Sequence, residues 1–291
     1  MLKSRKQKLK GAEVIEVSKK TEIVLTIFLV ILMLLFLIPI FLIFMNSFKS
    51  KLYISDIPFA MPTTETFVGL SNYISGIGKT GFINAFLNTA IITVLSVSAI
   101  ILFTSMTAWW LTRVKGIYSS ILYYLFVFAM IVPFQMVMFP LAKITDTLHF
   151  NTPIKIIFVY VGFGAGLSVF MFAGFVKSIP ISLEEAALID GCNPIQTFFR
   201  IICPVLKPTI ITVAILNAMW VWNDYLLPVL VLRSDYQTIP IAVQYLRGGY
   251  GSIDMGAMMA MLVLAIVPVI VFYLFCQKYI IKGVAAGAVK G

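Results

Sequence analysis

The residues best placed to do chemistry lie in a polar stretch, residues 177–208, between two long apolar runs. Ser182 precedes Glu185 by three positions, which is the spacing of a capping box at a helix start. Glu184 and Glu185 fall in the first turn of the predicted helix, where the helix dipole favours negative charge. The pattern predicts a short helix with an acidic first turn.

The same stretch contains residues that predict the end of this helix and the start of a second one. Gly191 suits the left-handed conformation that ends many helices. Asn193 and Pro194 form an N-cap followed by a proline at the first helical position. We expect the second helix to run from about Pro194 to Cys203 and to stop at Pro204. We therefore predict a helix, a glycine turn and a second helix. For Glu185 taken alone, an ordinary amphipathic surface helix is the favoured interpretation.

A second group of polar residues lies inside an apolar run. Asp224 is ionisable, and burying such a group in lipid is costly, so it is a functional hypothesis by default. Asn217 and Trp220 share its helix face at a spacing of i, i+3 and i+7, and Asn223 and Tyr225 flank it. Amides, a carboxylate and aromatic rings suit a hydroxyl-rich sugar. The alternative is that these residues hold helices together or form a gate.

The remaining reactive side chains do not form a catalytic group. His149 is the one histidine, and the three cysteines, Cys192, Cys203 and Cys276, include no CxxC pair. No GxxxxGK[ST] motif for nucleotide phosphates is present. We expect no catalytic residues, no metal site and no cofactor in this chain.

The elements that position these residues are membrane helices. Of 291 residues, 60% are hydrophobic and 12% are charged, which excludes a cytosolic enzyme and a disordered chain. A helix needs about 20 apolar residues to cross a bilayer. Six runs reach that length, and runs this long and apolar are helices. The sequence predicts an all-α polytopic protein with six transmembrane helices, at about 23–45, 86–111, 117–139, 154–176, 209–232 and 257–281.

Charge predicts the orientation. The net charge is +10, and most of the 22 Lys and Arg residues fall in segments on the same side as the N-terminus. Basic residues are enriched in cytoplasmic loops, so we expect both termini and the loop 177–208 in the cytoplasm. Residues 1–22 form a basic cytoplasmic tail that can contact lipid headgroups, and residues 23–291 form the membrane domain. The basic excess therefore indicates topology, and no nucleic-acid partner is expected.

The polar loop resembles the EAA loop of ATP-binding cassette (ABC) importer permeases, whose pattern is EAA-x3-G-x9-I-x-LP. One position departs from that pattern, because Cys203 stands where leucine is usual. The glycine-rich fourth run, with residues 167–170, and residues 222–225 of the fifth resemble the carbohydrate-uptake branch, in particular the smaller, six-span permease of maltose-type transporters. The residues that carry the match are Glu185, Ala186, Ala187, Gly191, Ile201, Cys203 and Pro204.

The resemblance implies the fold of a type I ABC importer permease and the function of a permease subunit in an ATP-driven sugar importer of the bacterial cell membrane. It implies four kinds of partner: a second, homologous permease that completes a heterodimer, two cytoplasmic ATPase subunits that bind ATP, an extracytoplasmic sugar-binding protein, and membrane lipid. The chain itself would be no enzyme. The residues implied in coupling to the ATPase are Glu184, Glu185, Ala186, Ala187, Gly191, Ile201 and Pro204.

Two alternatives stay open at this point. The importer could carry another solute, such as a polyamine or an amino acid, because Asp224 would suit a cation. The chain could also work alone as an ion-coupled secondary transporter, for which internal repeats and broken helices would be the expected features. Either of Glu184 and Glu185 could be the residue that meets the ATPase.

Overall fold

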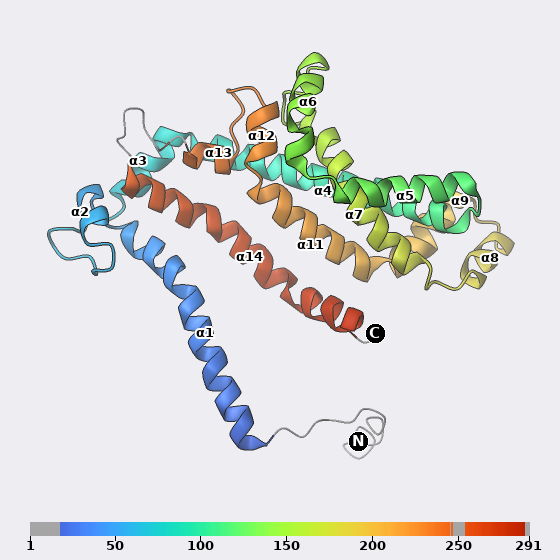
Figure 1. Cartoon of the computed structure of the whole chain (residues 1–291), viewed down its shortest axis with the longest axis horizontal. Helices are drawn as coiled ribbons and strands as arrows, with labels where there is room; N and C mark the ends of the chain where they lie inside the picture. Colours follow the sequence, from blue (N-terminus) through green and yellow to red (C-terminus); the bar gives the residue numbers. More distant parts are fainter. Residues whose placement is uncertain (1–17, 245, 247–253, 289–291) are drawn as a thin grey trace.

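A computed structural model describes residues 18–244, 246 and 254–288, so most of the predicted basic tail lies outside the described residues. The all-α prediction is confirmed for the described part of the chain (Figure 1). The helices are α1 (Lys19–Asn46), α2 (Lys51–Asp56), α3 (Ser71–Thr80), α4 (Phe82–Arg113), α5 (Ile117–Ile131), α6 (Phe134–Thr147), α7 (Ile156–Val176), α8 (Ser182–Ile189), α9 (Pro194–Thr197), the π-helix η1 (Phe198–Ile202), α10 (Cys203–Val205), α11 (Lys207–Asn223), α12 (Leu226–Val231), α13 (Ile239–Gln244) and α14 (Met255–Ala288).

Four of the described helices, α1, α4, α7 and α14, are long and apolar enough to cross a membrane as single rods. They correspond to the first, second, fourth and sixth predicted runs. The third run is a bent helix pair, α5 with α6, and most of the fifth run lies in α11, which forms a second bent pair with the segment Pro194–Val205 before it. Counting each pair as one span gives up to six. The structure therefore differs from the expectation of continuous helices at these two places.

The third run breaks between α5 and α6, which meet at an angle of 104°. Pro133 has no backbone N–H and disfavours helical geometry in the residue before it. Val132 accordingly takes an extended conformation with ψ of 115°. The chain then turns into α6, which packs against α12 (Figure 1).

The fifth run differs at both ends. The helical segment Pro194–Val205 precedes α11 at an angle of 78°, and α11 itself ends at Asn223. Asp224 is extended, with ψ of 126°, and α12 starts at Leu226. Residues 224–231 are thus no continuation of α11, although the hydropathy of the run is unbroken.

The close packing of α7 against its neighbours organises the centre of the protein. A Cβ atom on Gly166 would lie 2.8 Å from the backbone oxygen of Phe126 in α5, and one on Gly164 would lie 2.6 Å from Cδ1 of Ile100 in α4. Glycine therefore lets three membrane helices approach one another closely. Gly162 has open space around it and plays no such part.

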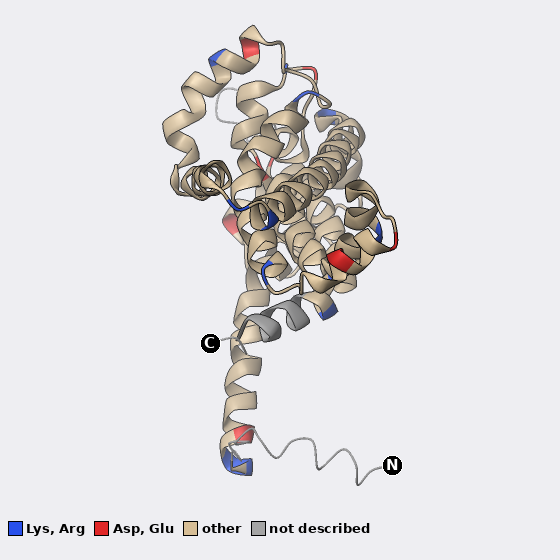
Figure 2. Cartoon of the chain, turned by 90° about the vertical axis from the view of Figure 1, so that its right-hand side faces the viewer, with Lys and Arg blue, Asp and Glu red and all other residues tan. Residues whose placement is uncertain are grey.

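The outermost helix is α1, which leaves the rest of the molecule as a single rod (Figure 1). Its most apolar 18-residue window has no buried residue, and its buried residues, Met45 and Asn46, lie at its C-terminal end beside α14. Charged side chains are sparse on the membrane helices and gather mainly at helix ends and connecting segments (Figure 2).

Candidate functional site

The predicted acidic helix of the polar loop is α8, and it ends as predicted. Gly191 has φ of +79°, in the left-handed region. The amide of Cys192 donates to the carbonyl of Ala187 at 2.9 Å, and the amide of Gly191 donates to the carbonyl of Leu188 at 3.0 Å. This pair of bonds is the Schellman closure of a helix. Because other residue types are strained at this φ, glycine is needed for the turn toward α9.

The predicted capping box at Ser182 is wrong. The N-cap position is Ile181, and no side chain caps α8. The amides of Glu184 and Glu185 instead donate to the carbonyl of Ile181, at 2.9 and 3.1 Å. The helix grows out of a turn that begins at Pro180, where the amide of Leu183 donates to the proline carbonyl at 3.3 Å, and that turn already occupies these amides.

The second helix of the loop starts as predicted and continues further than predicted. The amide of Gln196 donates to Oδ1 of Asn193 at 2.8 Å, and the amide of Asn193 donates to Oε1 of Gln196 at 2.9 Å, which forms a capping box. The helix does not stop at Pro204. It widens into η1, where the amide of Cys203 bonds to the carbonyl of Phe198, and this wider turn accommodates a proline that has no N–H to donate.

The two acidic residues of α8 have different surroundings. Oε1 of Glu184 accepts from Nε of Arg113 at 2.7 Å, and its Oε2 accepts from Nε1 of Trp109 at 3.0 Å. Both Glu184 and Arg113 are largely buried, with side-chain exposures of 14% and 17%. Glu185 is exposed and forms no ion pair with any described residue. Glu185 is therefore the acidic residue of α8 that is free to meet another protein.

An apolar surface surrounds Glu185. Leu188 and Ile189 are 70% and 85% exposed, and Ile195 at the start of α9 is 64% exposed. Ala186 is also exposed, whereas Ala187 is buried within the loop. Ile201 is half-buried and Pro204 is exposed. We call Glu185, Ala186, Leu188, Ile189 and Ile195 the knob surface. Exposed aliphatic side chains around one carboxylate are the chemistry of a protein-docking site.

Three of the five predicted pathway residues come together against α7. Nδ2 of Asn217 donates to Oγ of Ser168 at 3.2 Å, and the ring of Trp220 lies edge-on to the ring of Tyr160 with 5.4 Å between centroids. The hydroxyl of Tyr160 donates to Oδ2 of Asp224 at 3.1 Å. These contacts join α11 to α7, so this part of the predicted set holds helices together.

Asp224 has a further role at the start of α12. Its Oδ1 accepts from the amides of Leu226, at 3.0 Å, and Leu227, at 3.4 Å. Asp224 therefore lies just before α12 and caps its N-terminus, whereas the sequence predicted Asp224 inside a continuous helix. Its two carboxylate oxygens have protein partners. Asp224 and Trp220 line a cavity of about 180 Å³ together with Gln135.

The other two predicted residues face a different space. Asn223 and Tyr225 line a cavity of about 410 Å³ between α11, α13 and α14, together with Trp222 and Gln244. Nδ2 of Asn223 donates to the carbonyl of Met219, and its amide oxygen has no described partner. The three residues of the predicted face therefore stay together against α7, and the two flanking residues lie in a different environment.

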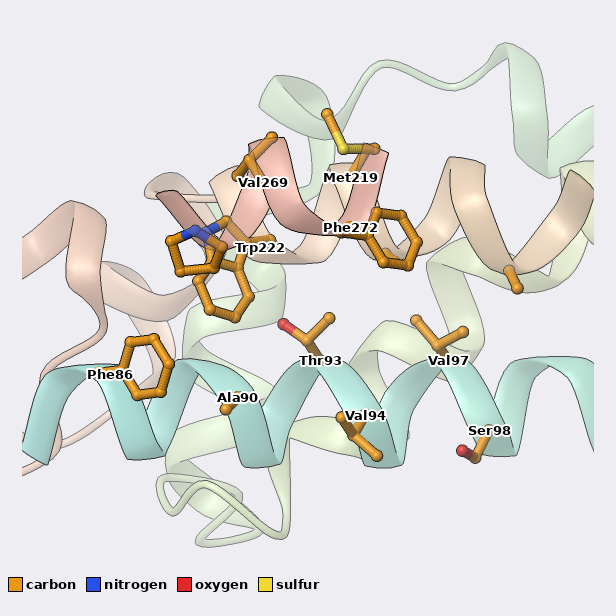
Figure 3. Close-up of a pocket in the computed structure, with 13 residues that line it drawn as sticks. Phe86, Ala90, Thr93, Val94, Val97, Ser98, Met219, Trp222, Val269 and Phe272 are labelled. Carbon is orange, nitrogen blue, oxygen red and sulfur yellow. The ribbon is translucent and has the colours of Figure 1, made fainter. Parts of the chain in front are cut away.

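A third, nearly apolar cavity of about 430 Å³ lies between α4, α11 and α14 (Figure 3). Phe86 and Val97 of α4 lie on one side of it, and Trp222 and Met219 of α11 and Phe272 of α14 on the other. Its lining is mainly apolar, and Thr93, Ser98 and Trp222 are the lining residues whose side chains carry a hydrogen-bonding group. It therefore suits apolar contacts better than it suits a sugar.

Residues 100–286 match the family described as "Binding-protein-dependent transport system inner membrane component". The chain belongs to this family. It is therefore a multi-pass membrane permease of a transport system, as the sequence predicted, and the family is a transport component and no enzyme.

Curated relatives of this permease cover nearly its whole length. It is 43% identical to the "Probable starch degradation products transport system permease protein AmyC" of Thermoanaerobacterium thermosulfurigenes, over 91% of this chain and 96% of that one. It is 36% identical to the "Multiple sugar-binding transport system permease protein MsmG" of Streptococcus mutans, over 88% and 92%. A chain in the crystal structure of a bacterial ABC transporter that imports the acidic polysaccharide alginate has the same fold, with a TM-score of 0.73, 24% identity, and coverage of 90% of this permease and 98% of that chain.

The sequence missed Tyr160, Trp109 and Arg113 of this permease. Each is a polar side chain in or at the end of a membrane helix, which is the feature that could have drawn attention to it. Their partners lie 64 to 75 residues away, so no local spacing relates them. In the described part of the chain, no three His, Cys, Asp or Glu side chains are grouped so as to hold a metal ion.

Proposed function

We propose that this permease is a subunit of an ATP-driven sugar importer and forms half of its translocation pathway. The observation that carries the proposal is the similarity, over 91% of the chain, to a permease named for starch degradation products. Relatives named for multiple sugars and for arabinooligosaccharides support the same class of cargo. ATP is bound and hydrolysed by partner chains.

The knob surface is the proposed docking site for an ATPase subunit. Its aliphatic side chains would enter a groove of the ATPase, and Glu185 would pair with a basic side chain there, which fixes the register. Ala186 is small enough to let α8 approach the groove closely, and Gly191 sets the angle between α8 and α9. Ile201 and Pro204 act within the loop by shaping η1 and its exit toward α11.

The second permease of the heterodimer is the proposed partner of α1. A 28-residue helix with its apolar side chains exposed needs either lipid or protein around it. Because α1 is anchored at one end and otherwise stands away from its own core, it can reach a homologous subunit without disturbing that core (Figure 1). The second ATPase subunit would dock on the corresponding loop of that partner.

The outside of the membrane is proposed to be the side of α2, α3 and α13, where a sugar-binding protein docks. Arg113, Lys177 and Lys207 border the opposite side, next to α8, and basic residues favour the cytoplasm. Both termini are then cytoplasmic. An alginate transporter of similar fold was crystallised in complex with an alginate pentasaccharide-bound periplasmic protein, which supports a binding protein as a partner.

For the pathway, we propose that Asn223, Tyr225 and Gln244 meet the sugar, because an amide with an unpartnered oxygen, a second amide and an exposed phenol line one cavity. Asn217, Trp220 and Asp224 are proposed to hold α11 and α12 against α7. Asp224 does not call for a cationic cargo, because both of its carboxylate oxygens already accept hydrogen bonds from the protein.

The test is reconstitution in proteoliposomes with the second permease, the ATPase subunits and the binding protein. We expect sugar uptake that depends on ATP and on each of these three kinds of protein partner. Leu188→Asp and Ile189→Asp together should release the ATPase from the purified complex, whereas Ile74→Asp, an equally exposed apolar residue of α3, should not. Uptake by the permease alone, without an ATPase, would contradict the proposal and favour a secondary transporter.

A further inference from the structure

The last turn of α4 is bonded to the coupling helix α8 by a compact polar cluster. Arg113 donates from Nε to Glu184, at 2.7 Å, and from Nη2 to the carbonyl of Ile179, at 2.9 Å. Trp109, one turn earlier, donates to the other carboxylate oxygen at 3.0 Å. Charge-assisted hydrogen bonds between largely buried groups are stronger than neutral bonds at the surface. We call Trp109, Arg113, Ile179 and Glu184 the clamp.

The clamp is a direct link between α8 and a membrane-crossing helix. The larger packing contacts of α8 are with α9 and η1, which belong to the same loop, and Ala187 is its buried residue. The ring of Trp109 also packs on the ring of Phe198 in η1, with 5.6 Å between centroids. A displacement of α8 is therefore transmitted to α4 by the hydrogen bonds of the clamp as well as by packing within the loop.

At its opposite end α4 is bonded to the segment that contains α13. Nδ2 of Asn88 donates to the carbonyl of Gln237 at 3.1 Å, and Oγ1 of Thr89 accepts from the amide of Ile239 at 2.9 Å. The helix is unbroken between Asn88 and Arg113, which are 25 residues apart and therefore separated by about 38 Å at about 1.5 Å per residue. One rod thus joins α8 to the far end of the molecule (Figure 1).

We propose that Glu184 and Arg113 are positioning residues that make α4 move with α8, so that motion of the ATPase reaches the outer segment at α13 and the wall of the cavity in Figure 3. The proposal rests on the proposed function, because it takes α8 as the point where the ATPase acts. It assigns different work to the two glutamates: Glu185 docks the ATPase, and Glu184 transmits its motion.

The experiment uses the complete importer in proteoliposomes and measures sugar molecules taken up per ATP hydrolysed. Glu184→Gln and Arg113→Gln should each lower this ratio by roughly two- to thirtyfold, the range expected when one coupling contact is lost. The ATPase subunits should stay bound and ATP hydrolysis should continue. The double variant should be no worse than the poorer single variant, because both changes break the same link.

Controls separate transmission from folding and from docking. Lys115→Gln removes a charge two residues from Arg113 at an exposed position and should keep the wild-type ratio. Arg113→Lys retains a cationic donor to the carboxylate, and Trp109→Phe retains an aromatic ring beside Phe198 but loses the Nε1 donor. Both should lower the ratio less than Arg113→Gln.

Four outcomes would overturn the proposal: a wild-type ratio in both single variants, additive effects in the double variant, loss of the ATPase subunits from the Glu184→Gln complex, or a ratio that falls only in proportion to the amount of folded permease. Failure of the wild-type permease to retain an ATPase at all would instead contradict the proposed function.

Discussion

At the residue scale, single positions of the polar loop are set by backbone geometry. Gly191 holds a φ that costs other residue types about 1–2 kcal/mol, and two backbone hydrogen bonds depend on it. Two residues after Gly191, a second helix begins at Asn193. The side chains of Asn193 and Gln196 each accept a hydrogen bond from the other residue's backbone amide. The shape of the knob surface is thus determined locally, within residues 180–197.

We predict that Gly191→Val lowers sugar uptake at least several-fold while the amount of permease in the membrane stays normal. The β-branched side chain opposes the left-handed turn, so α9 leaves α8 at a different angle and the knob surface is distorted. Uptake and immunoblotting of membranes measure the two quantities. Gly116→Ala is the matched control, because Gly116 is extended, with φ of 166°, and has open space around it. Normal uptake with Gly191→Val would contradict the role given to the turn.

A second residue-scale prediction concerns acid. Burial raises the pKa of Asp254, but the hydrogen bonds from Lys79 and from the amide of Ala257 outweigh it, so the pKa lies below its ordinary value of 3.8. A lowered folded-state pKa contributes stability above the unfolded pKa, and this contribution is lost as the pH falls through the folded value.

The melting temperature of the detergent-purified permease should therefore fall more steeply below pH 3.8 for the wild type than for Asp254→Asn. At neutral pH the same variant should melt lower than the wild type. Asp235→Asn, whose side chain is 65% exposed in an ion pair with Arg233, should change neither value. Parallel pH profiles for the wild type and Asp254→Asn would show that the Lys79 contact contributes nothing.

At the element scale, the close approach of α5 to α7 is a test of the helix packing. Gly166→Ala should lower the free energy of unfolding by about 1–3 kcal/mol, because its Cβ would lie 2.8 Å from a backbone carbonyl that cannot move independently. Gly162→Ala, in open space on the same helix, should be neutral or stabilising by up to about 1 kcal/mol. Unfolding of both variants in detergent measures the difference, and equal effects would refute the packing described for α5 and α7.

Much of the element structure follows from the sequence. The apolar runs predict the membrane helices, and Gly191 and Asn193 predict the end of α8 and the start of α9. The breaks within the third and fifth runs, at Pro133 and at Asp224, do not follow from hydropathy, because one proline or one carboxylate hardly changes the average over a window. The break at Pro133 requires backbone reasoning, and the cap at Asp224 depends on which amides its side chain reaches.

Hydrogen-bond partners that lie far apart in the sequence cannot be predicted from local residue spacing. Glu184 has the same predicted surroundings as Glu185 from sequence alone, and only the fold brings Arg113 to one and not the other. The predicted cap by Ser182 does not form, because the backbone turn at Pro180 already provides partners for the amides that Ser182 was expected to bind.

At the scale of the whole molecule, the permease presents one extended apolar element outside its core. We predict that a photoreactive residue at Phe36 of α1, which is 75% exposed, cross-links to the second permease in membranes that contain the full importer. A probe at Phe59, which is 77% exposed in the segment after α2, is the matched control and should give little of this product. Cross-links from Phe36 to lipid alone would contradict the contact proposed for α1.

The central claim is that the ATPase grips the knob surface, and site-specific cross-linking in the assembled importer tests it most directly. A photoreactive residue at Ile189, the most exposed apolar position of α8, should cross-link to an ATPase subunit, and the yield should change when ATP is added. The same residue at Ile74 should give no such product. An ATPase that cross-links elsewhere on the permease and never to Ile189 would contradict the account.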